Sequence, residues 1–516
     1  MSEPWVRFED EHLLAVAKPA GVNTHHADEH AQDGMVDWVQ RQRPDARLSV
    51  LHRLDKGTSG LLLFGKTTLA NRSLSAQFEG RTVAKHYELL VARDDARPSS
   101  LRSRQLIEGA EAETDFARSA VGPALERWSA HPHTGRTHQV RVHATTAGMP
   151  IIGDDEHHGV DAARLFLHAA GLEVDHPTDG ALRLSAARPA SFDVALGGAD
   201  PGDSAMAAAV ADEARALLFD PTDTNAYLWI DREHDAFPST RVERLGDVAL
   251  VLRYDDTPVP EAWLDAWNGA APLQAIYEQA KPRGGGADPA RLLSGTATER
   301  FEVTELGARY LIDLTASTTS SGLFLDQRET RRELMGMDLD GKTVLNTFAH
   351  TGSLSVAAAR AGAEVLTLDL SKRYLDWAAD NLRLNDIDPA DHDAVFGDTG
   401  EWLDRFAKKR RTFDVVLVDP PSTSTPRKKG GRRWVVDKDL HTLVEQAVRV
   451  TAPQGRVYVS TNLHRMTWPT FLDQLEDGVA AAGRVGTIST RTLPLDHRSG
   501  PGDPPYLKAA WIRLDR

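Results

Sequence analysis

The chain contains no cysteine among its 516 residues. Disulfide bonds, thiolate zinc sites and cysteine nucleophiles are therefore all excluded. Long apolar runs are missing too: no segment approaches the ~18 uncharged apolar residues of a membrane-spanning helix. The N-terminal MSEPWVRFEDEHLL has acidic residues where a secretory signal needs a basic start and an apolar core. These absences predict a cytoplasmic protein.

Basic residues are in the minority, with 60 Lys and Arg against 75 Asp and Glu and a formal net charge of −15. This balance argues mildly against a nucleic-acid partner. The basic residues cluster, however, as KKRR at 408–411 and RKKGGRR at 427–433. An acidic protein with such a local basic face can bind RNA, although both runs could also be solvated loops without a partner.

The length exceeds what one hydrophobic core supports and predicts about two to four domains. Short β-rich runs between Gly, Pro and Asp turns predict a mixed α+β domain over residues 1–197. A linker with an Ala-rich helix follows at 198–221, and a small α+β module is expected at 222–295. Over 296–516, strand-like and helix-like runs alternate, which predicts a parallel, Rossmann-like sheet with helices on both faces.

Two motifs at domain-scale separation define the first candidate site, HRLDKGTSG at 52–60 and GRTHQVRVH at 135–143. The first holds Asp55 in a loop that leads into an apolar run, so we expect its carboxylate to project into a basic cleft. The second is also read as an alternating run, which would put Arg136 and Arg141 on opposite faces of a strand.

Together with IIGDDEHHG at 151–159 and RLFLHA at 164–169, these motifs resemble the RluA family of pseudouridine synthases. The resemblance implies isomerisation of uridine in RNA, without a metal or cofactor. A carboxylate nucleophile is sufficient for such a reaction, and a base taken out of its stack needs an aromatic surface and cations around it. By motif match, the implied catalytic residues are Asp55, Tyr87, Arg141 and Arg53, with Lys85 and Arg136 as RNA-binding candidates.

Each of the catalytic residues has a role by resemblance. Asp55 matches the catalytic carboxylate, and Arg141 the arginine that pairs with it. Tyr87, in the strand-like run AKHYELLVA, matches the tyrosine that packs on the uracil and serves as a base. Arg53 matches the arginine that fills the position vacated by the base.

The second candidate site consists of motifs at successive strand ends of the predicted parallel sheet, where such folds bind ligands. Gly352 lets the backbone approach a cofactor closely, and Asp369 is placed to accept hydrogen bonds from ribose hydroxyls. In class I methyltransferases, which this layout resembles, the next acidic position, Asp398, contacts adenine, and Asp419 with Pro420 faces the methyl donor and the target nitrogen. The cofactor-binding candidates are Arg328, Asn346, Phe348, Thr351, Gly352, Asp369, Asp398 and Asp419.

Residues from about 222 to 516 resemble RlmK-type methyltransferases, the half of RlmKL that forms 7-methylguanosine in large-subunit ribosomal RNA. The resemblance implies S-adenosylmethionine as cofactor, and an antiparallel edge strand for LKAAWIRLD at 507–515. RlmI-type enzymes share GLFLDQR-like motifs but attack cytosine with a cysteine, which this chain lacks. A guanine nitrogen is therefore the better target. The basic run that follows the DPP motif at 419–421 supplies further RNA-binding candidates: Arg427, Lys428, Lys429, Arg432 and Arg433.

Two other patterns are read as incidental. GMDLDGKT at 336–343 satisfies the Walker A pattern, but it leads into a strand where a phosphate-binding loop would open a helix. The histidines at 25, 26, 30, 157 and 158 have no carboxylate or thiolate at ligand spacing, so we expect surface histidines and no metal.

The sequence thus predicts a bifunctional enzyme, a pseudouridine synthase joined to a guanine methyltransferase, acting on ribosomal RNA. Transfer RNA as substrate and methylation at N2 of guanine remain open. The alternative from another class is an RNA-binding assembly factor whose catalytic sites have decayed.

Overall fold

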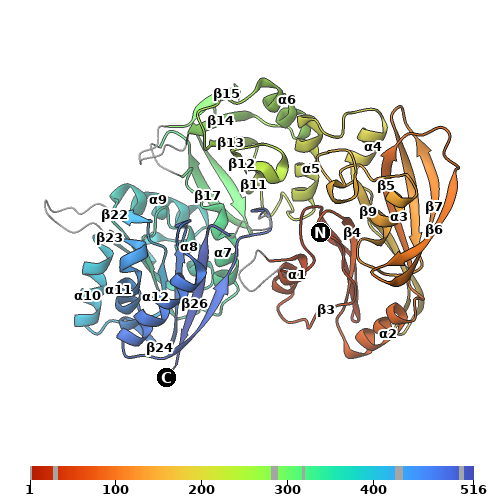
Figure 1. Ribbon diagram of the computed structural model, residues 1–516. Helices are drawn as coiled ribbons and strands as arrows, with labels where there is room; N and C mark the ends of the chain where they lie inside the picture. Colours follow the sequence, from red (N-terminus) through yellow and green to blue (C-terminus); the bar gives the residue numbers. More distant parts are fainter. Residues whose placement is uncertain are drawn as a thin grey trace.

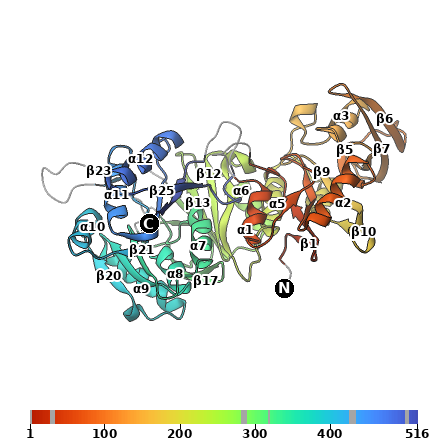
Figure 2. The same ribbon diagram turned by 90° about the horizontal axis from the view of Figure 1, so that it is seen from below.

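The computed structural model describes residues 3–26, 33–280, 289–316, 320–424, 434–498 and 505–515. Three large sheets follow one another along the chain, and the second lies between the other two in both ribbon views (Figure 1, Figure 2). The combination of mixed sheets with one Rossmann-like sheet is the predicted fold class, and its parts come in the predicted order.

The first sheet is mixed, with the order β1-β2-β4-β9-β5-β8-β7-β6; in addition, β3 pairs with β4 and β10 with β9. Its pairs are antiparallel except for β4 with β9. The strands are β1 Val6–Glu9, β2 Leu13–Lys18, β3 Ser49–Val50, β4 Ser59–Gly65, β5 Ala84–Ala92, β6 Ser100–Ile107, β7 Ala110–Val121, β8 Leu125–Pro132, β9 Leu167–His176 and β10 Gly180–Ser185. The helices are α1 Met35–Gln42, α2 Thr68–Glu79, α3 Gln139–Thr146 and α4 Ala190–Leu196, with the short 3-10 helix η1 Asp155–His157.

The central strands β2 and β4 are apolar runs that are buried at every residue. A strand without an exposed face must be covered on both sides. One face packs against α1 through Trp38 and Val39, and the opposite face packs against α2 through Ala70 and Leu74. Because β4 begins shortly after Asp55, the loop that holds this residue is anchored to the most rigid part of the domain.

The prediction that GRTHQVRVH forms a strand is wrong, because residues 139–146 are the helix α3. His138 precedes the helix in the left-handed conformation, with φ 53°. Positions three apart lie on one face of a helix. His138 lies outside this periodicity, but it and Arg141 both reach Asp55, whereas a strand would have separated Arg136 from Arg141 across the sheet.

The second sheet has the order β11-β12-β13-β14-β15 and follows α5, Ser204–Ala216. Only β13 and β14 are parallel, and α6, Glu261–Ala270, makes the crossover that a parallel pair requires. The strands are β11 Ala226–Asp231, β12 Thr240–Leu245, β13 Val248–Arg253, β14 Ala275–Ala280 and β15 Arg291–Gly295, with the 3-10 helix η2 Arg232–Asp235 after β11.

Helix α5, which the sequence places in a linker, belongs to two hydrophobic cores. Ala207, Ala208 and Ala211 pack with Trp229 of the second sheet. Met206 and Val210 pack with Leu90 and Phe166 of the first domain. The Ala-rich composition that favours the helix also lets both neighbours approach it closely, so this helix joins the first two sheets.

The third sheet has the order β20-β19-β18-β21-β24-β26-β25 and follows the hairpin of β16, Arg300–Glu305, and β17, Ala308–Asp313. Its strands are β18 Thr343–Thr347, β19 Glu364–Asp369, β20 Asp393–Phe396, β21 Phe413–Val418, β24 Thr451–Thr461, β25 Gly486–Arg491 and β26 Lys508–Leu514. Its helices are α7 Arg328–Met335, α8 Ser353–Arg360, α9 Lys372–Leu384, α10 Thr399–Lys408, α11 Val436–Arg449 and α12 Trp468–Ala481, with the 3-10 helices η3 Leu325–Gln327 and η4 Pro389–Asp391. The short strands β22, Thr423–Ser424, and β23, Trp434–Val435, pair with each other.

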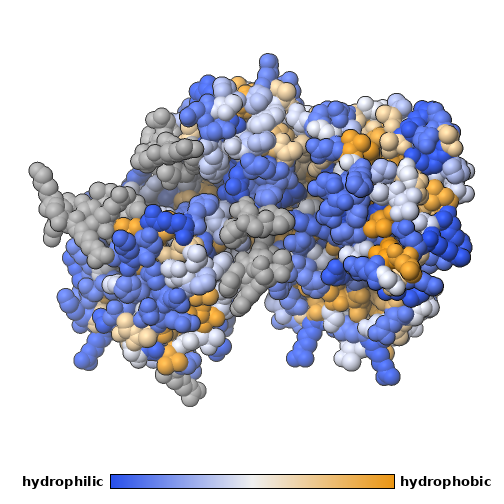
Figure 3. All heavy atoms as spheres, viewed as in Figure 1, coloured by the Kyte–Doolittle hydropathy of each residue, from blue (hydrophilic) through white to orange (hydrophobic). Residues whose placement is uncertain are grey.

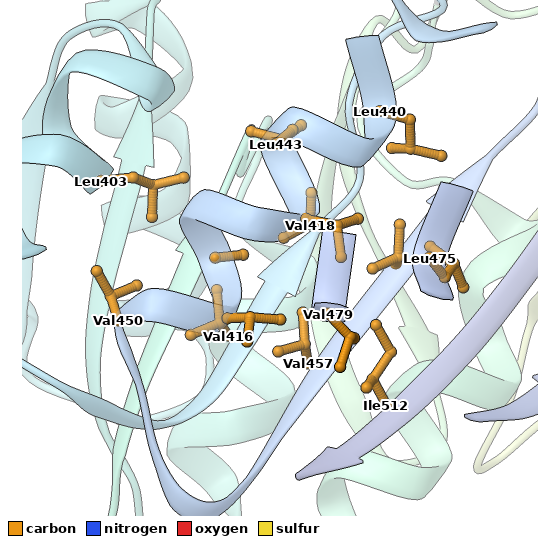
Figure 4. Close-up of a cluster of buried hydrophobic side chains, with 14 of the residues drawn as sticks. Leu403, Val416, Val418, Leu440, Leu443, Val450, Val457, Leu475, Val479 and Ile512 are labelled. Carbon is orange, nitrogen blue, oxygen red and sulfur yellow. The ribbon is translucent and has the colours of Figure 1, made fainter. Parts of the chain in front are cut away.

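Helices cover both faces of this sheet, as the alternating pattern predicts. Figure 4 shows Leu440 and Leu443 of α11 and Leu475 of α12 beside Val416 and Val418 of β21. The opposite face packs on α7 and α8. The Walker-like segment lies between α7 and β18 and leads into the strand, so it does not open a helix.

The last strand, β26, is antiparallel, as the resemblance implies, but it is not at the edge. It lies between β24 and β25, and it pairs antiparallel with both. Its burial at nearly every residue agrees with this internal position. The edge is β25, a strand with alternating exposure.

A buried ionic network joins the three parts of the molecule. Asp496, which follows β25, accepts hydrogen bonds from Arg328 Nη1 of α7 at 2.7 Å and from the Leu228 amide of β11 at 2.9 Å. Its backbone carbonyl also accepts from Arg215 of α5 at 3.3 Å. Glu305 of β16 completes the network by accepting from Arg328 at 3.1 Å. The carboxylate charges offset the burial of these guanidinium groups.

The part of the chain that the structure describes contains no helix long and apolar enough to cross a membrane. The face drawn in Figure 3 is largely hydrophilic, with small scattered hydrophobic patches.

Two candidate active sites

The loop that holds Asp55 is fixed by hydrogen bonds from the segment after β2. Thr24 donates its hydroxyl to the Leu54 carbonyl at 2.7 Å, and it accepts from the Leu54 amide at 3.1 Å. Lys18 donates to the Lys56 carbonyl at 3.2 Å. The residues on either side of Asp55 are thus tied down, which leaves its partly exposed carboxylate in a defined position.

Sheet pairing brings Tyr87 to this loop. Gly60 of β4 and Tyr87 of β5 both pair with Ala169 of β9, so the three lie side by side across the sheet. Gly60 has φ +120°, and a Cβ there would lie 2.2 Å from the Ala169 carbonyl oxygen. Only glycine fits this approach. Burial, and in addition the negative charge of Asp55, raise the pKa of the Tyr87 phenol, so it is protonated at neutral pH.

Arg141 lies between Asp55 and a second carboxylate. Its Nη1 is 3.6 Å from Asp55 Oδ2, while Nε and Nη2 bind Asp154 at 2.8 Å and 2.5 Å. The fork of hydrogen bonds to buried Asp154 fixes the guanidinium plane. His138, just before α3, has its Nε2 3.8 Å from Asp55 Oδ1. The predicted Asp55 and Arg141 pair is therefore close in space, and Asp154 orients it.

Lys18 is a member of this site that the sequence reasoning missed. Its ammonium is fully buried and donates to the carbonyls of Pro19 at 3.0 Å and Val22 at 2.7 Å. The pKa of Lys18 is lowered to about 7. Burial is the main cause, nearby cations contribute, and the negative charge of Asp55 opposes the shift. A lysine that ends an otherwise apolar strand just before a proline was the available signal.

The remaining predicted residues of the first site differ in exposure. Arg53 is exposed next to Asp55. Lys85 is partly buried and donates to the Thr134 carbonyl at 3.3 Å, and burial lowers its pKa. Arg136 is also partly buried, and its amide donates to Gln139 at 3.0 Å.

The prediction that the histidines lack a carboxylate neighbour is wrong for His157. Tertiary structure brings one potential ligand atom each of His138, Glu156 and His157 within 4.8 Å of one another. Arg141 Nη2 lies 3.3 Å from Glu156, so this carboxylate already has a cationic partner. The cluster is part of the surroundings of Asp55.

In the second site, Asp419 directly follows the carboxyl end of β21. It accepts a hydrogen bond from the Ser460 hydroxyl at 2.5 Å and a longer one from the Gln327 amide at 3.3 Å. Burial raises the pKa of Asp419 to about 6, the negative charge of Asp326 adds to the rise, and the two hydrogen bonds oppose it. Pro420 is buried behind it.

Gln327 is held so that its NH2 group points toward Asp419. Its carbonyl oxygen accepts from the Tyr458 hydroxyl at 2.7 Å and from the Thr330 hydroxyl at 2.9 Å. With the acceptor side occupied by two donors, the amide nitrogen must face Asp419 and Ser460. Sequence reasoning recognised the GLFLDQR motif but not this role of Gln327, nor that of Ser460 at the end of β24.

Asp369, at the end of β19, has the features expected for binding hydroxyl groups. Its two oxygens accept from the backbone amides of His350 at 2.9 Å and Ser371 at 2.8 Å. Burial raises the pKa of Asp369, while these hydrogen bonds oppose the rise. Leu370 and Phe396, at the ends of β19 and β20, are 36% and 42% exposed, which leaves apolar surface beside the carboxylate for a flat ring.

The end of β18 and the turn after it carry four other predicted cofactor residues. Gly352 has φ +75° and would place a Cβ 2.5 Å from that of Ala378, so no other residue fits. Thr351 is buried, and Phe348 is partly buried with φ 53°. The buried Asn346 side chain donates to Ser355 at 2.9 Å, which links β18 to α8.

Asp398 and the basic run complete the predictions for this site. Asp398 is exposed after β20 and caps α10 by accepting from the Glu401 amide at 3.0 Å. Among the described residues, its second carboxylate oxygen has no hydrogen-bond partner, and it lies at the strand end where the resemblance places it. The RNA-binding candidates Arg427, Lys428, Lys429, Arg432 and Arg433 lie outside the described residues.

The prediction that Arg328 binds the cofactor is wrong. Its guanidinium is 1% exposed and binds Glu305, Asp496 and the Ala226 carbonyl. All three nitrogens therefore face the junction between the second and third sheets. The motif places Arg328 one residue after Gln327, but the helix that begins there turns the arginine away from the strand ends.

Two family models match the chain. Residues 12–146 match the model described as RNA pseudouridylate synthase, and residues 265–484 match the model described as S-adenosylmethionine-dependent methyltransferase. The first match contains Asp55, Tyr87 and Arg141, and the second contains Asp369 and Asp419.

Curated relatives and solved structures agree with the second match. Ribosomal RNA large subunit methyltransferase K/L of Allochromatium vinosum is 40% identical over 206 residues, covering 40% of this chain and 26% of the relative. Ribosomal RNA large subunit methyltransferase K of Neisseria meningitidis serogroup B is 36% identical over 207 residues, covering 40% and 56%. The chain thus spans only about a quarter to just over half of these relatives' length.

A solved structure extends the likeness in space. The crystal structure of SMU.776, a putative methyltransferase complexed with SAH, is 25% identical with a TM-score of 0.55, covering 66% of this chain and 88% of that one. The part of the chain built on the third sheet thus resembles S-adenosylmethionine-dependent methyltransferases in both sequence and fold.

Proposed function

We propose that this chain, which joins a part of the RNA pseudouridylate synthase type to a part of the S-adenosylmethionine-dependent methyltransferase type, is a bifunctional RNA-modifying enzyme. It isomerises uridine to pseudouridine at Asp55 and methylates guanine beside Asp419. The observation that supports this most is that each carboxylate stands within its own set of oriented partners, in separate parts of one chain. A protein that only binds RNA would not need a carboxylate with oriented partners at either site.

At the first site, the Asp55 carboxylate attacks C1′ of the target uridine. The C1′–N1 bond breaks, its electron pair stays on the uracil, and an ester forms between Asp55 and the sugar. Arg141, at 3.6 Å, offsets the charge of the carboxylate and keeps it aimed. The uracil then turns, C5 attacks C1′, and the ester bond breaks to release Asp55. Loss of the C5 proton and gain of one at N1 complete an isomerisation without net redox change.

Tyr87 packs on the uracil and takes the C5 proton. Because its raised pKa keeps the phenol protonated, it must release its own proton as it accepts the new one. The partly exposed Asp55 carboxylate, free again after the second step, is the acceptor. Arg53, exposed beside it, fills the space that the extruded base leaves in the RNA.

At the second site, the residues at the strand ends fit S-adenosylmethionine. Asp369 would hold the ribose hydroxyls, and the exposed Leu370 and Phe396 with Asp398 would receive the adenine. When bound, the cofactor supplies an electrophilic methyl group. Gly352 and its neighbours bring the backbone of the turn after β18 against it.

We propose N7 of guanine as the methyl acceptor. N7 carries a free lone pair, so no proton has to leave, but the base gains a positive charge. The Asp419 carboxylate, with Asp326 nearby, stabilises that charge. Methylation of cytosine at C5 through a cysteine that attacks C6 is excluded, because the chain has no cysteine. N2 of guanine would instead require Asp419 to accept a proton.

Large-subunit ribosomal RNA is the proposed substrate, because the methyltransferase relatives carry that name. Transfer RNA is the alternative. Nucleoside mass spectrometry of ribosomal and transfer RNA from a deletion strain tests both activities at once. Loss of one pseudouridine and one 7-methylguanosine from 23S-type RNA is expected. Loss of a 2-methylguanosine would change the acceptor, losses confined to transfer RNA would change the substrate, and no loss would favour a decayed scaffold.

A further inference from the structure

Arg498, from the methyltransferase part of the chain, reaches the first catalytic site. It follows Asp496 in the segment after β25, and its side chain is about nine-tenths buried. Nη1 binds Asp235 of the second sheet at 2.9 Å and donates to the His234 carbonyl at 3.3 Å. Nη2 donates to the Ala20 carbonyl at 3.4 Å, in the segment that supports the Asp55 loop.

Asp235 does not need Arg498 for its own neutralisation. Arg215 binds both of its oxygens, at 3.1 Å and 2.7 Å, and the Asp231 amide donates to it at 2.8 Å. Burial lowers the pKa of Arg498 to about 10, so holding the charged guanidinium in this position costs free energy of folding. What distinguishes Arg498 from Arg215 is its contact with the pseudouridine synthase part.

The contact continues to the catalytic loop through Gly21. This residue has φ +80°, and a Cβ there would lie 2.8 Å from Arg498 Nη1. The Gly21 amide donates to the Lys56 carbonyl at 2.8 Å, and Lys56 is the residue after Asp55. The positive charge of Arg498 also contributes to the lowered pKa of Lys18, the buried lysine that binds the same carbonyl.

We propose that Arg498 is a positioning residue for pseudouridine formation, so that the pseudouridine synthase site is completed by a residue of the methyltransferase part. Arg498 supports the backbone at residues 20 and 21, and this backbone fixes the Lys56 carbonyl and with it the direction of the Asp55 carboxylate. The inference rests on the proposed function of Asp55. It implies that the fusion is required for the first activity and not merely a tether.

The test compares Arg498→Met and Arg498→Lys with Arg484→Met in the full chain, with both products measured on the same RNA. Methionine keeps most of the side-chain length but removes the charge and the donors. Arg484 is the matched control, because it is a partly buried arginine of the same part that donates to two backbone carbonyls, of Thr451 and Asp515. It contacts neither site.

Arg498→Met is expected to lower kcat for pseudouridine formation by about 10- to 100-fold, the effect of a displacement of roughly 1 Å at a catalytic group. KM for the RNA should stay within about threefold, because the RNA-facing cations are unchanged. Arg498→Lys, which keeps a cation and a donor, should recover most of the rate. Methyl transfer should stay within about twofold in every variant, and Arg484→Met should leave both rates unchanged.

A second variant approaches the same contact from the other side. Gly21→Ala adds the Cβ that meets Arg498, so it should lower pseudouridine formation on its own. In the Arg498→Met background the clash is relieved, while the strain of an alanine at φ +80° remains. The combined loss should therefore be smaller than the product of the single losses by at least about threefold. Independent multiplication of the two losses would show that the residues do not act through one contact.

Three results would overturn the inference: an unchanged kcat in Arg498→Met, an equal loss of both activities together with a lower melting temperature, or a change confined to KM. A wild-type protein that forms no pseudouridine would instead remove the proposed function itself, so the two failures can be told apart.

Discussion

The two aspartates proposed as catalytic occupy opposite electrostatic environments. Asp55 has the Arg141 guanidinium at 3.6 Å, the His138 ring at 3.8 Å and Lys18 beneath its loop. Among the described residues, no Lys, Arg or His forms an ion pair with Asp419, whose partners are a hydroxyl, an amide and the negative field of Asp326. One side-chain type is thus held in two different electrostatic settings.

The difference between the surroundings of Asp55 and Asp419 matches the different requirements of the two proposed reactions. Displacement at C1′ needs a carboxylate held in position, and the neighbouring Arg141 guanidinium fits that need. Methylation of a neutral ring nitrogen creates a positive charge in the base, and an unpaired carboxylate is most effective there because no cation competes for it. Asp496 is a useful contrast, since it is buried and paired with Arg328, which holds the pKa of Asp496 far below the usual range.

The largest expected effect separates the two sites. Asp55→Ala should reduce pseudouridine formation by at least about a thousandfold, because the nucleophile is lost, and leave methyl transfer within about twofold. Asp419→Ala should do the reverse. Rates for both products are measured on one RNA by nucleoside mass spectrometry. Loss of both products from either change, in a folded protein, would contradict the assignment of two sites.

Removing the paired carboxylate should have the largest effect on stability. Asp496→Ala removes one of the two carboxylates that bind the buried Arg328, leaving Glu305 as the other, and should lower the free energy of unfolding by up to roughly 3–5 kcal/mol. Asp496→Asn, which keeps an acceptor for the Leu228 amide, should cost less. Urea unfolding followed by tryptophan fluorescence measures both. A cost of less than about 1 kcal/mol for the alanine variant would mean that the network does not hold the parts together.

Removing the charge of Asp419, the carboxylate without a cationic partner, should instead raise the free energy of unfolding. The pKa of Asp419 in the folded protein is about 6, above its ordinary 3.8, so the folded state binds the extra proton between these values. Stability therefore falls as pH rises through this window, and the full cost is present above pH 6. Asp419→Asn should raise stability at pH 8 by up to ~3 kcal/mol, and this gain should disappear near pH 4. A gain that is independent of pH would show that ionisation is not its source.

The smallest effect is a pH dependence of methyl transfer. If the ionised Asp419 is the active form, the single-turnover rate should fall about tenfold per unit below pH 6. Asp326→Asn removes a negative neighbour but keeps an acceptor for the Tyr506 hydroxyl, so it should move the midpoint downward. A midpoint that moves upward, or does not move, would remove Asp326 from the electrostatics of the site.

Local sequence patterns accounted for much of this molecule. The apolar runs of β2 and β4 and the strand-helix alternation after residue 343 predicted the mixed and the parallel sheets. They could do so because buried strands and amphipathic helices have characteristic periods. The short run GRTHQVRVH shows the limit. Its apolar residues fit both periods over so few positions, and packing on the first sheet decided for a helix.

By itself, the sequence determined which residues are the candidates for chemistry: Asp55, Tyr87, Asp369 and Asp419 stand in motifs at loop and strand ends, where side chains of adjacent elements converge. Tertiary structure alone decided which charges meet. Arg328 lies within a cofactor motif and yet is buried against Asp496, 168 residues away. Lys18 and Arg498 come from opposite ends of the chain and support one catalytic loop. The physical reason is that local periodicity specifies strands and helices, whereas a buried ion pair depends on the packing of whole elements, which no short window of sequence contains.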